Sequence, residues 1–289
     1  MTTIIEQART SGLLFDGAMG TMFIQKGLTG GQVSEYWTLE HPDAVTEIHR
    51  QYIEAGADVL TTNTFGGNAF KLARSGLAER IEEINRTAVA LARAAAGKKG
   101  YVAGDLGSTG EMLAPVGTLK PQAAQAAFKE QAGYLAQAGA DLIIVETMFD
   151  LAEALAAIQG AREACDVPIF ATMTFQETPQ GFVTIMGNEA EDSLSQLLAA
   201  GALAVGANCS LGSDAMLTMA RQLRAKFDAP LIFQPNAGMP ETEDDQIFYP
   251  EKAEGYAENL IRLKALGIEI IGGCCGTTPD YIRAIRDRL

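Results

Sequence analysis

Hydrophobic and polar positions alternate along the whole chain in one repeating pattern, a short apolar run followed by a longer amphipathic, alanine-rich segment. Apolar runs of this length predict strands at 13–16, 59–62, 101–105, 142–146, 169–172, 204–208, 231–234 and 268–271. The longer segments predict helices at 42–55, 78–96, 121–138, 150–164, 189–200, 213–226, 250–266 and 279–289. In the first helix Ile48, Tyr52 and Ile53 share one face, as a 3.6-residue period requires.

The ends of the predicted elements carry recurring signals. A proline is expected at the first helical position in four helices, at Pro42, Pro121, Pro250 and Pro279. The segments 55–58 and 138–141 both read Ala-Gly-Ala-Asp between a helix and a strand, and 200–202 and 266–268 are looser versions. Glycine directly after a helix supplies the left-handed residue that ends it.

Eight strand–helix units predict an α/β fold, a (β/α)8 TIM barrel with residues 1–289 forming a single domain. An open doubly wound sheet would produce the same alternation. We expect the barrel because no Gly-x-Gly-x-x-Gly turn follows the first strand.

Composition narrows the class of protein. The 289 residues are 47% hydrophobic, enough for a large core, and carry a formal net charge of −14 without a run of Lys or Arg. Such a chain is a poor partner for nucleic acid. It has no apolar run that could cross a membrane and no signal peptide at its start, so we expect a cytoplasmic protein.

The active site of a parallel barrel lies at the carboxyl ends of its strands. All three candidate cysteines fall there, Cys209 after the sixth strand and Cys274 and Cys275 after the eighth. Strand eight closes next to strand one, so Cys274 and Cys275 should face Asp16. Other polar residues expected at this rim are Thr62, Asn63, Asp105, Glu146, Thr147, Thr172, Asn208 and Asn236.

Three convergent thiolates are a ligand set suited to zinc, and three protein ligands leave the fourth position open for catalysis. Adjacent cysteines can also be small buried hydrophobic residues. The glycines around Cys274 and Cys275 favour the metal site, because they offer nothing to pack against. We interpret Cys165 as a structural thiol, and His41 and His49 as surface or capping residues.

Two acids on the rim suggest an amino-acid ligand. Glu146 follows the apolar run 142–145, where a carboxylate is costly unless it meets a cation. Glu146 would pair with a substrate ammonium group, or else it would form an internal salt bridge or cap the next helix. Asp150 is better placed to cap that helix. Asp16 has the same two interpretations, and the small-residue turn 17–21 could hold a carboxylate through its amides.

The motifs at several strand ends resemble those of a known family. They are Asp16-Gly17-Ala18-Met19-Gly20-Thr21, Thr62-Asn63-Thr64-Phe65-Gly66, Gly104-Asp105-Leu106-Gly107, Val145-Glu146-Thr147, Asn208-Cys209-Ser210-Leu211-Gly212, Pro235-Asn236-Ala237-Gly238 and Gly272-Gly273-Cys274-Cys275-Gly276-Thr277-Thr278-Pro279. The chain resembles the homocysteine S-methyltransferase superfamily almost end to end. Within it, the chain is similar to the homocysteine-binding modules of cobalamin-dependent methionine synthases.

The resemblance implies roles for individual residues. Cys209, Cys274 and Cys275 would bind zinc, and Asn236 would supply a labile oxygen ligand that the substrate sulfur displaces. The homocysteine amino group would be held by Asp16, Thr62 and Glu146, and its carboxylate by Gly17 with Ala18.

The expected function is therefore zinc-dependent methyl transfer. Homocysteine bound as a zinc thiolate would attack the methyl group of methylcobalamin or another methylcorrinoid, carried by a separate protein, to give methionine. Alternatives are a sulfonium or betaine-type donor, a different thiol acceptor, a module that only presents the thiol, or a structural zinc site with four protein ligands. The stretch 239–249, with Glu241, Glu243, Asp244 and Asp245, is expected to be a solvated loop.

Overall fold

A computed structural model describes residues 3–29, 31–243 and 246–289, and contains a parallel eight-stranded sheet. The strand order is β1-β12-β9-β8-β5-β4-β3-β2. The strands are β1 (Leu13–Leu14), β2 (Val59–Thr61), β3 (Tyr101–Leu106), β4 (Leu142–Met148), β5 (Ile169–Met173), β8 (Ala204–Gly212), β9 (Leu231–Asn236) and β12 (Ile270–Ile271). A parallel bridge from Phe15 to Val59 joins the two outermost strands. The sheet thus closes into the predicted barrel.

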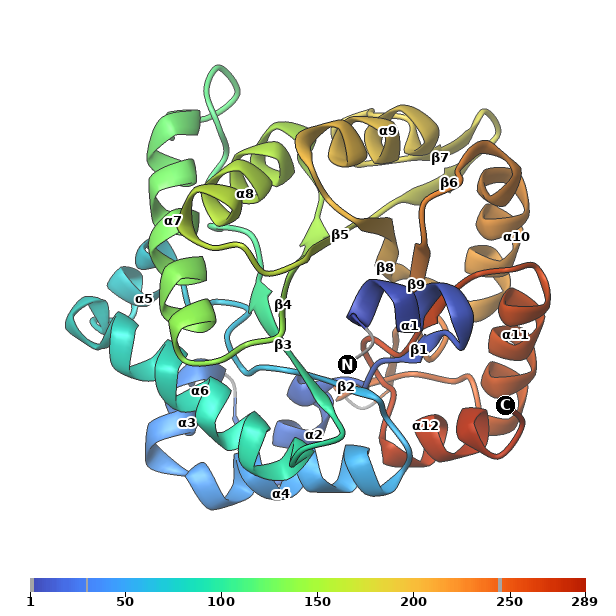
Figure 1. Ribbon diagram of the computed structural model, residues 1–289, viewed down its shortest axis with the longest axis horizontal. Coiled ribbons are helices and arrows are strands. Elements are labelled where there is room, and N and C mark those ends of the chain that lie inside the picture. Colours follow the sequence, from blue (N-terminus) through green and yellow to red (C-terminus); the bar gives the residue numbers. More distant parts are fainter. Residues whose placement is uncertain (1–2, 30, 244–245) are drawn as a thin grey trace.

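Helices surround the barrel, each covering the strands next to it (Figure 1). They are α4 (Pro42–Glu54), α6 (Ile81–Ala96), α7 (Pro121–Gln137), α8 (Leu151–Ala164), α9 (Ala190–Ala200), α10 (Ser213–Leu223), α11 (Ala253–Ala265) and α12 (Pro279–Arg286). The proline starts of α4, α7 and α12 are confirmed. The start at Pro250 is wrong, because α11 begins three residues later, at Ala253. No helix of the described ranges is both long and apolar enough to cross a membrane.

Several shorter elements were not predicted. They are α1 (Ile4–Thr10), α2 (Met19–Gln25), η1 (Ser34–Tyr36), α3 (Trp37–Glu40), α5 (Ala69–Arg74) and the hairpins β6 (Gln176–Thr178)–β7 (Gly181–Val183) and β10 (Glu241–Glu243)–β11 (Gln246–Phe248). The short helices η2 (Ala78–Arg80) and η3 (Arg224–Lys226) lie within the predicted helices 78–96 and 213–226. The second hairpin lies in the stretch expected to be a solvated loop: the stretch is solvent-exposed as expected, with Met239 and Ile247 among its exposed side chains, but it forms a hairpin and not a loop. Asp244 and Asp245 lie outside the described residues.

The core has two layers because side chains alternate between the two faces of each strand. Inward-facing residues such as Phe15, Ile144 and Phe170 fill the barrel together with Ile4 and Ala8 of α1. Helix α1 therefore closes the amino-terminal end of the barrel, where Figure 1 shows it lying across the strands. Outward-facing strand residues pack against the surrounding helices in a larger cluster.

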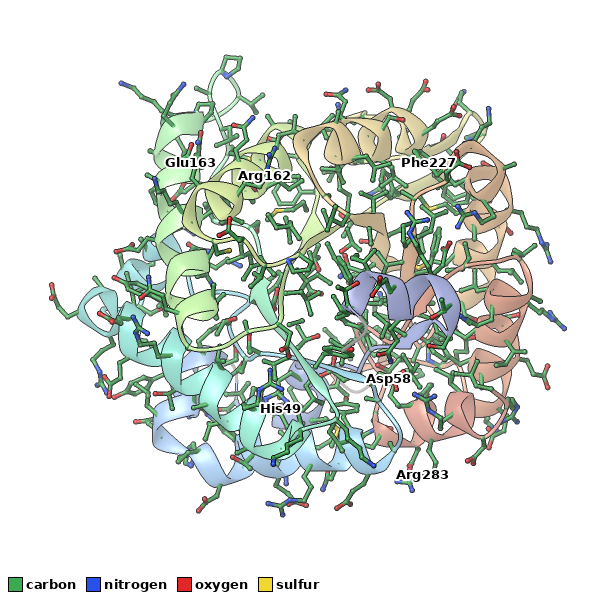
Figure 2. The ribbon with its side chains drawn as sticks, viewed as in Figure 1. His49, Asp58, Arg162, Glu163, Phe227 and Arg283 are labelled. Carbon is green, nitrogen blue, oxygen red and sulfur yellow. The ribbon has the colours of Figure 1, made fainter. Side chains whose placement is uncertain are left out.

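The amino-terminal end is also fixed by three acid–arginine pairs, which we call the strand-start pairs. Each acid directly precedes a strand, accepts a hydrogen bond from the main-chain N–H of a neighbouring strand, and pairs with an arginine outside the barrel. The three pairs are Asp58–Arg286, Asp141–Arg93 and Glu269–Arg224, and the N–H donors are those of Leu14, Val102 and Leu231. Figure 2 labels Asp58 at this end, near α1. The Ala-Gly-Ala-Asp repeat supplies two of these acids.

Candidate functional site

The three candidate cysteines meet at the carboxyl-terminal end of the barrel. The thiol sulfurs of Cys209, Cys274 and Cys275 all lie within 4.8 Å of one another. The Sγ atoms of Cys209 and Cys275 are 3.8 Å apart. Tetrahedral zinc with bonds of about 2.3 Å to sulfur would place two sulfurs about 3.8 Å apart. The cysteines are therefore spaced as zinc ligands, and no His, Asp or Glu of the described ranges completes a fourth position.

The end of β8 holds Cys209 in an uncommon backbone conformation. Cys209 and Ser210 have φ angles of 58° and 59°, in the left-handed region that side chains with a Cβ rarely adopt. Such conformations persist where the surrounding structure imposes them, and they concentrate at functional sites. The preceding residue Asn208 is fully buried and accepts hydrogen bonds from Thr147 N and Thr172 Oγ1, both at 2.8 Å.

Asn208 also contacts the sulfur cluster, with Nδ2 3.9 Å from Cys274 Sγ. A residue behind the ligands that fixes their orientation is a usual component of a metal centre. Asn208 is thus a further candidate site residue, which the sequence analysis placed on the rim but did not assign to the site. Its signal was its position, directly before a candidate ligand.

The loop after β12 approaches its neighbours too closely for side chains at two glycines. A Cβ at Gly273 would lie 2.4 Å from Thr277 Oγ1. Gly276 has φ 83°, and a Cβ there would lie 2.3 Å from the ring of Tyr249. These glycines let the chain turn tightly around Cys274 and Cys275, as predicted. Tyr249, which follows β11, consequently packs against the loop beside Cys275.

The ionisation of the thiols supports binding of a cation. Hydrogen bonds from the thiols of Cys209 and Cys274 lower the pKa of Cys275 to about 3. Hydrogen bonds involving Cys209 and Cys275 raise the pKa of Cys274 well above its usual value. One thiolate therefore forms readily, whereas three so close together would need a positive charge among them. The cluster thus has the composition and the charge requirement of a zinc site.

A cavity of about 740 Å³ opens beside the sulfurs and is large enough for a substrate together with part of a donor. Its polar wall contains Asp16, Thr62, Asp105, Glu146 and Gln234. Its outer wall is largely apolar and contains Met19, Ile24, Phe65, Ile247 and Phe248. The cavity brings together the cysteines and all the residues predicted to bind substrate, including Gly17 and Ala18.

Two of these residues are already engaged within the protein. Both carboxylate oxygens of Asp16 accept hydrogen bonds from Thr61, one from N at 2.8 Å and one from Oγ1 at 2.9 Å. Thr62 Oγ1 accepts the N–H of Asp105 at 3.0 Å and shares a proton with Thr64 Oγ1 at 2.7 Å. Thr64 Oγ1 in turn donates to Asp105 O. The hydroxyl proton of Thr62 is therefore donated to Thr64 Oγ1. Towards a ligand, Thr62 can act only as a hydrogen-bond acceptor.

The turn after Asp16 is only partly available to a ligand. Ala18 N donates to Thr277 Oγ1 at 3.2 Å, so this amide is used within the protein. The amide of Gly17 donates to no described residue. Gly17 thus remains a candidate carboxylate contact, whereas Ala18 would need to exchange its partner.

Neither Glu146 nor Asp105 forms a salt bridge with a described residue, and both hold their proton more tightly than an exposed carboxyl group. Burial, followed by the charges of Asp16 and Cys275, raises the pKa of Glu146 to about 8. Burial, followed by the charges of Glu146 and Glu35, raises the pKa of Asp105 well above its ordinary value. Glu146 forms no salt bridge among the described residues, which leaves it free for a ligand. The sequence analysis placed Asp105 on the rim but assigned it no role in the site; the signal was its inward register, two residues after Ala103.

The remaining predicted residues lie in different surroundings. Asn236 is buried at the end of β9 next to the sulfur loop, and its Oδ1 has no partner among the described residues. It does not line the cavity. Cys165 is half-buried at the end of α8, away from the site. Asp150 caps α8 through Ala152 N, as predicted.

The prediction that both histidines lie at the surface or cap a helix is confirmed for the exposure of His41 and is wrong for His49. His41 is exposed before α4, although its side chain caps nothing. His49 is fully buried on α4, since its position falls on the face of that helix that packs inward with Val45 and Tyr52. Burial lowers the pKa of His49 to about 4.

Comparison with known proteins gives a consistent result. The family described as homocysteine S-methyltransferase matches residues 13–289. The chain is 32% identical to a methionine synthase of Mycobacterium leprae over 98% of its own length, and 34% identical to one of Mycobacterium tuberculosis over 93%. It spans only 25% and 24% of those two proteins, about a quarter of their length.

Solved structures agree. The crystal structure of the homocysteine methyltransferase MmuM from Escherichia coli in its metallated form superposes with a TM-score of 0.82 and 26% identity, covering 97% of both chains. The apo form of that enzyme gives a TM-score of 0.77 and 25% identity. With the barrel, the three-sulfur cluster and the family match all in place, the chain belongs to the homocysteine S-methyltransferase family.

Proposed function

We propose that this barrel methylates the sulfur of homocysteine to give methionine, using zinc held by Cys209, Cys274 and Cys275. The single observation that carries the proposal is the cluster of three sulfurs in the lining of a cavity that also contains carboxyl groups with no salt-bridge partner among the described residues. A thiol and an ammonium group on the same small molecule match these two features.

The residues of the chain would bind and orient the acceptor. Glu146, on the polar wall, would accept hydrogen bonds from the ammonium group, and Gly17 would donate its amide to the carboxylate. Bound zinc would supply the positive charge that keeps the substrate sulfur deprotonated near neutral pH. Asn236, whose Oδ1 has no partner among the described residues, would be the oxygen that the incoming sulfur displaces.

Methyl transfer would then be a direct displacement. The sulfur lone pair of homocysteine forms a bond to the methyl carbon, and the bond from that carbon to the donor breaks with its electron pair remaining on the donor. The thiol proton leaves to solvent when the sulfur is bound. The protein contributes mainly position, because it holds the sulfur at the open end of a rigid barrel.

The preferred methyl donor is a methylcorrinoid that is carried by a separate protein. Supporting this choice, the curated relatives are methionine synthases three quarters of whose length lies outside the match. The exposed apolar side chains Ile24 and Ile247 at the cavity mouth also suit a large donor. A small sulfonium or betaine-type donor is the second candidate, because the negative charge of Asp16, Asp105 and Glu146 would attract a cation.

The experiment compares donors on the zinc-loaded chain. Homocysteine is incubated with methylcobalamin, S-methylmethionine or betaine, and methionine is measured by mass spectrometry. Methionine formed from methylcobalamin supports the preferred donor, and methionine formed only from a cationic donor supports the second candidate. A chain that binds homocysteine without turning over any donor would be a presenting module.

Cys275→Ala tests the role of the sulfur cluster, with Cys165→Ala as the matched control. Removing one of three ligands should abolish both bound zinc and methyl transfer, while circular dichroism of the fold is retained. Cys165→Ala should retain both, since Cys165 lies away from the site. Full activity of zinc-free Cys275→Ala would refute the proposal.

A further inference from the structure

One buried carboxylate in the cavity has no hydrogen-bond donor. Asp105, at the end of β3, is 3% exposed, and its Oδ1 has no partner among the described residues. The other buried acids of the described chain do have donors: Asp16 accepts from Thr61, Glu35 from Gly66 N and Glu153 from Thr109. Asp105 therefore differs from every comparable acid.

The main chain of Asp105 is held firmly while its side chain is left unpaired. Its N–H donates to Thr62 Oγ1 at 3.0 Å, and its carbonyl accepts from Thr64 Oγ1 at 2.9 Å and from Gln131 Nε2 at 3.2 Å. Gln131 is a fully buried polar residue on α7, and the one other described group to which its side chain donates is Thr64 O. These contacts fix the position of the carboxylate, which lines the cavity.

A buried carboxylate without donors is costly, and the cost is usually offset by a cation. The cation whose charge acts on the pKa of Asp105 is that of Lys71. Lys71 forms no salt bridge in the described part of the chain, and its Nζ lies over the Phe65 ring, 4.3 Å from the centroid. The cation that Asp105 faces directly would therefore come from a ligand.

The neighbouring strand supplies a second acid for the same cation. In the register of β3 and β4, Asp105 pairs with Ile144, and Glu146 is the next inward-facing residue after Ile144. The negative charge of Glu146 is the largest electrostatic influence on Asp105. An ammonium group has three N–H donors and could bridge the carboxyl groups of Asp105 and Glu146, while each oxygen of Asp16 already accepts one hydrogen bond from Thr61 and keeps one further acceptor site.

We propose that Asp105, together with Glu146, binds the α-ammonium group of the acceptor, and that this contact selects an amino acid over a simple thiol. Asp16, which also lines the cavity, additionally fixes Thr61 at the end of β2 through two hydrogen bonds. The inference rests on the proposed function, because it concerns the acceptor at that same site.

The test compares two thiols that differ only in the amino group. L-Homocysteine and 4-mercaptobutanoate share the thiol, the chain length and the carboxylate. Their affinities for the zinc-loaded full chain are measured by calorimetry. Asp105→Asn should weaken homocysteine binding about 10- to 100-fold and leave 4-mercaptobutanoate within about twofold, since a lost partner for a buried charged group acts only on the ligand that carries the group.

Glu153→Gln is the matched control. Glu153 is another buried acid whose charge environment includes Lys71, but it does not line the cavity. This variant should leave the preference for homocysteine unchanged. Equal weakening of both thiols in Asp105→Asn, or the same loss of preference in Glu153→Gln, would mean that Asp105 only balances Lys71 and would overturn the inference.

Two further outcomes separate this inference from the proposed function. A wild-type chain that binds both thiols equally well contradicts the role of Asp105 but leaves zinc-dependent thiol methylation intact. A zinc-loaded chain that binds neither thiol contradicts the proposed function itself. Asp105→Ser, a smaller substitution, provides the same comparison if the amide variant does not fold.

Discussion

Acidic side chains at the two ends of the barrel have opposite surroundings. At the amino-terminal end Asp58, Asp141 and Glu269 each pair with an arginine and accept a main-chain hydrogen bond from a neighbouring strand. At the carboxyl-terminal end Asp16 and Asp105 are buried and Glu146 is half-buried, and none of them forms a salt bridge with a described residue. A carboxylate at the amino-terminal end is neutralised by an arginine. A carboxyl group at the carboxyl-terminal end has no such partner and is either charged or protonated.

The difference separates stability from function within one fold. A paired acid at the start of a strand connects two strands to the helical layer and strengthens the barrel. An unpaired acid at the end of a strand weakens the empty protein, because its charge is buried, and becomes favourable only when a cation binds. Parallel barrels place their active sites at this second end. The acids that pair with arginine lie at the amino-terminal end of the barrel, and the acids without such a partner lie at the other end. This difference identifies the active-site end without reference to the cysteines.

The largest expected effect comes from breaking a strand-start pair. Arg224 and Glu269 are the most buried of the three, each with 19% of its side chain exposed. Arg224→Leu should lower the free energy of unfolding by about 3–5 kcal/mol, because Glu269 would keep a buried charge without a partner. Urea denaturation at pH 7 measures the change.

The control for that prediction is Lys129→Ala, which breaks a pair with Glu163 whose side chains are half exposed. Exposed pairs contribute little, so we expect a loss of less than about 1 kcal/mol. Similar losses in the two variants would show that the strand-start pairs have no special structural role, and the comparison between the two ends would fail.

The next effect concerns pH at the opposite end. The pKa of Glu146 rises from 4.5 to about 8 on folding, so the folded protein retains a proton that the unfolded chain has lost. The stability of the zinc-free protein should therefore fall as pH rises from about 4.5 to about 8, by at most about 1.4 kcal/mol per pH unit from this group. Asp16, whose pKa burial raises to about 7, contributes in the same direction.

The variant Glu146→Gln isolates the contribution of Glu146 to this pH dependence of stability. Urea midpoints of the zinc-free protein between pH 5 and pH 8 should decline less steeply in the variant than in the wild type, while Asp16 and Asp105 leave a residual slope. Identical slopes in both proteins would mean that Glu146 is ionised throughout the range. The interpretation that Asp16, Asp105 and Glu146 have no cationic partner in the folded protein would then be contradicted.

The smallest effect tests the hydroxyl that joins two strand ends at the rim. Thr62→Val should lower the free energy of unfolding by about 1–3 kcal/mol, because it leaves the buried N–H of Asp105 without an acceptor. Thr62→Ser retains the hydroxyl and should lose less. Equal losses in the two variants would indicate that Thr62 stabilises by packing alone, which denaturation of both proteins can establish.

The strands and the metal centre could be predicted closely because local patterns encode them. Apolar runs marked all eight barrel strands, and the glycines around Cys274 and Cys275 indicated a tight loop. The order of the strands brought Cys209 beside them, since β8 and β12 both flank β9. The hairpin β10–β11 was missed because its charged residues resemble those of a solvated loop, although Ile247 and Phe248 line the cavity.

The substrate wall was harder to predict. Asp16, Thr62 and Glu146 all line the cavity, yet the sequence could not show that Asp16 and Thr62 are engaged with Thr61, Thr64 and Asp105. His49 was misplaced because a histidine on an amphipathic helix can lie on either side of the boundary between its faces. Such assignments depend on partners distant in the chain.

By itself, the sequence determined the barrel, its parallel strands and the three cysteines at one rim, because periodicity and local turn chemistry act over a few residues. Only the tertiary structure decided which acids meet an arginine and which remain unpaired. That outcome depends on contacts between segments far apart in the chain, such as Asp58 with Arg286 and Asp141 with Arg93. The free energy of a buried charge is set by those contacts and not by the residue type.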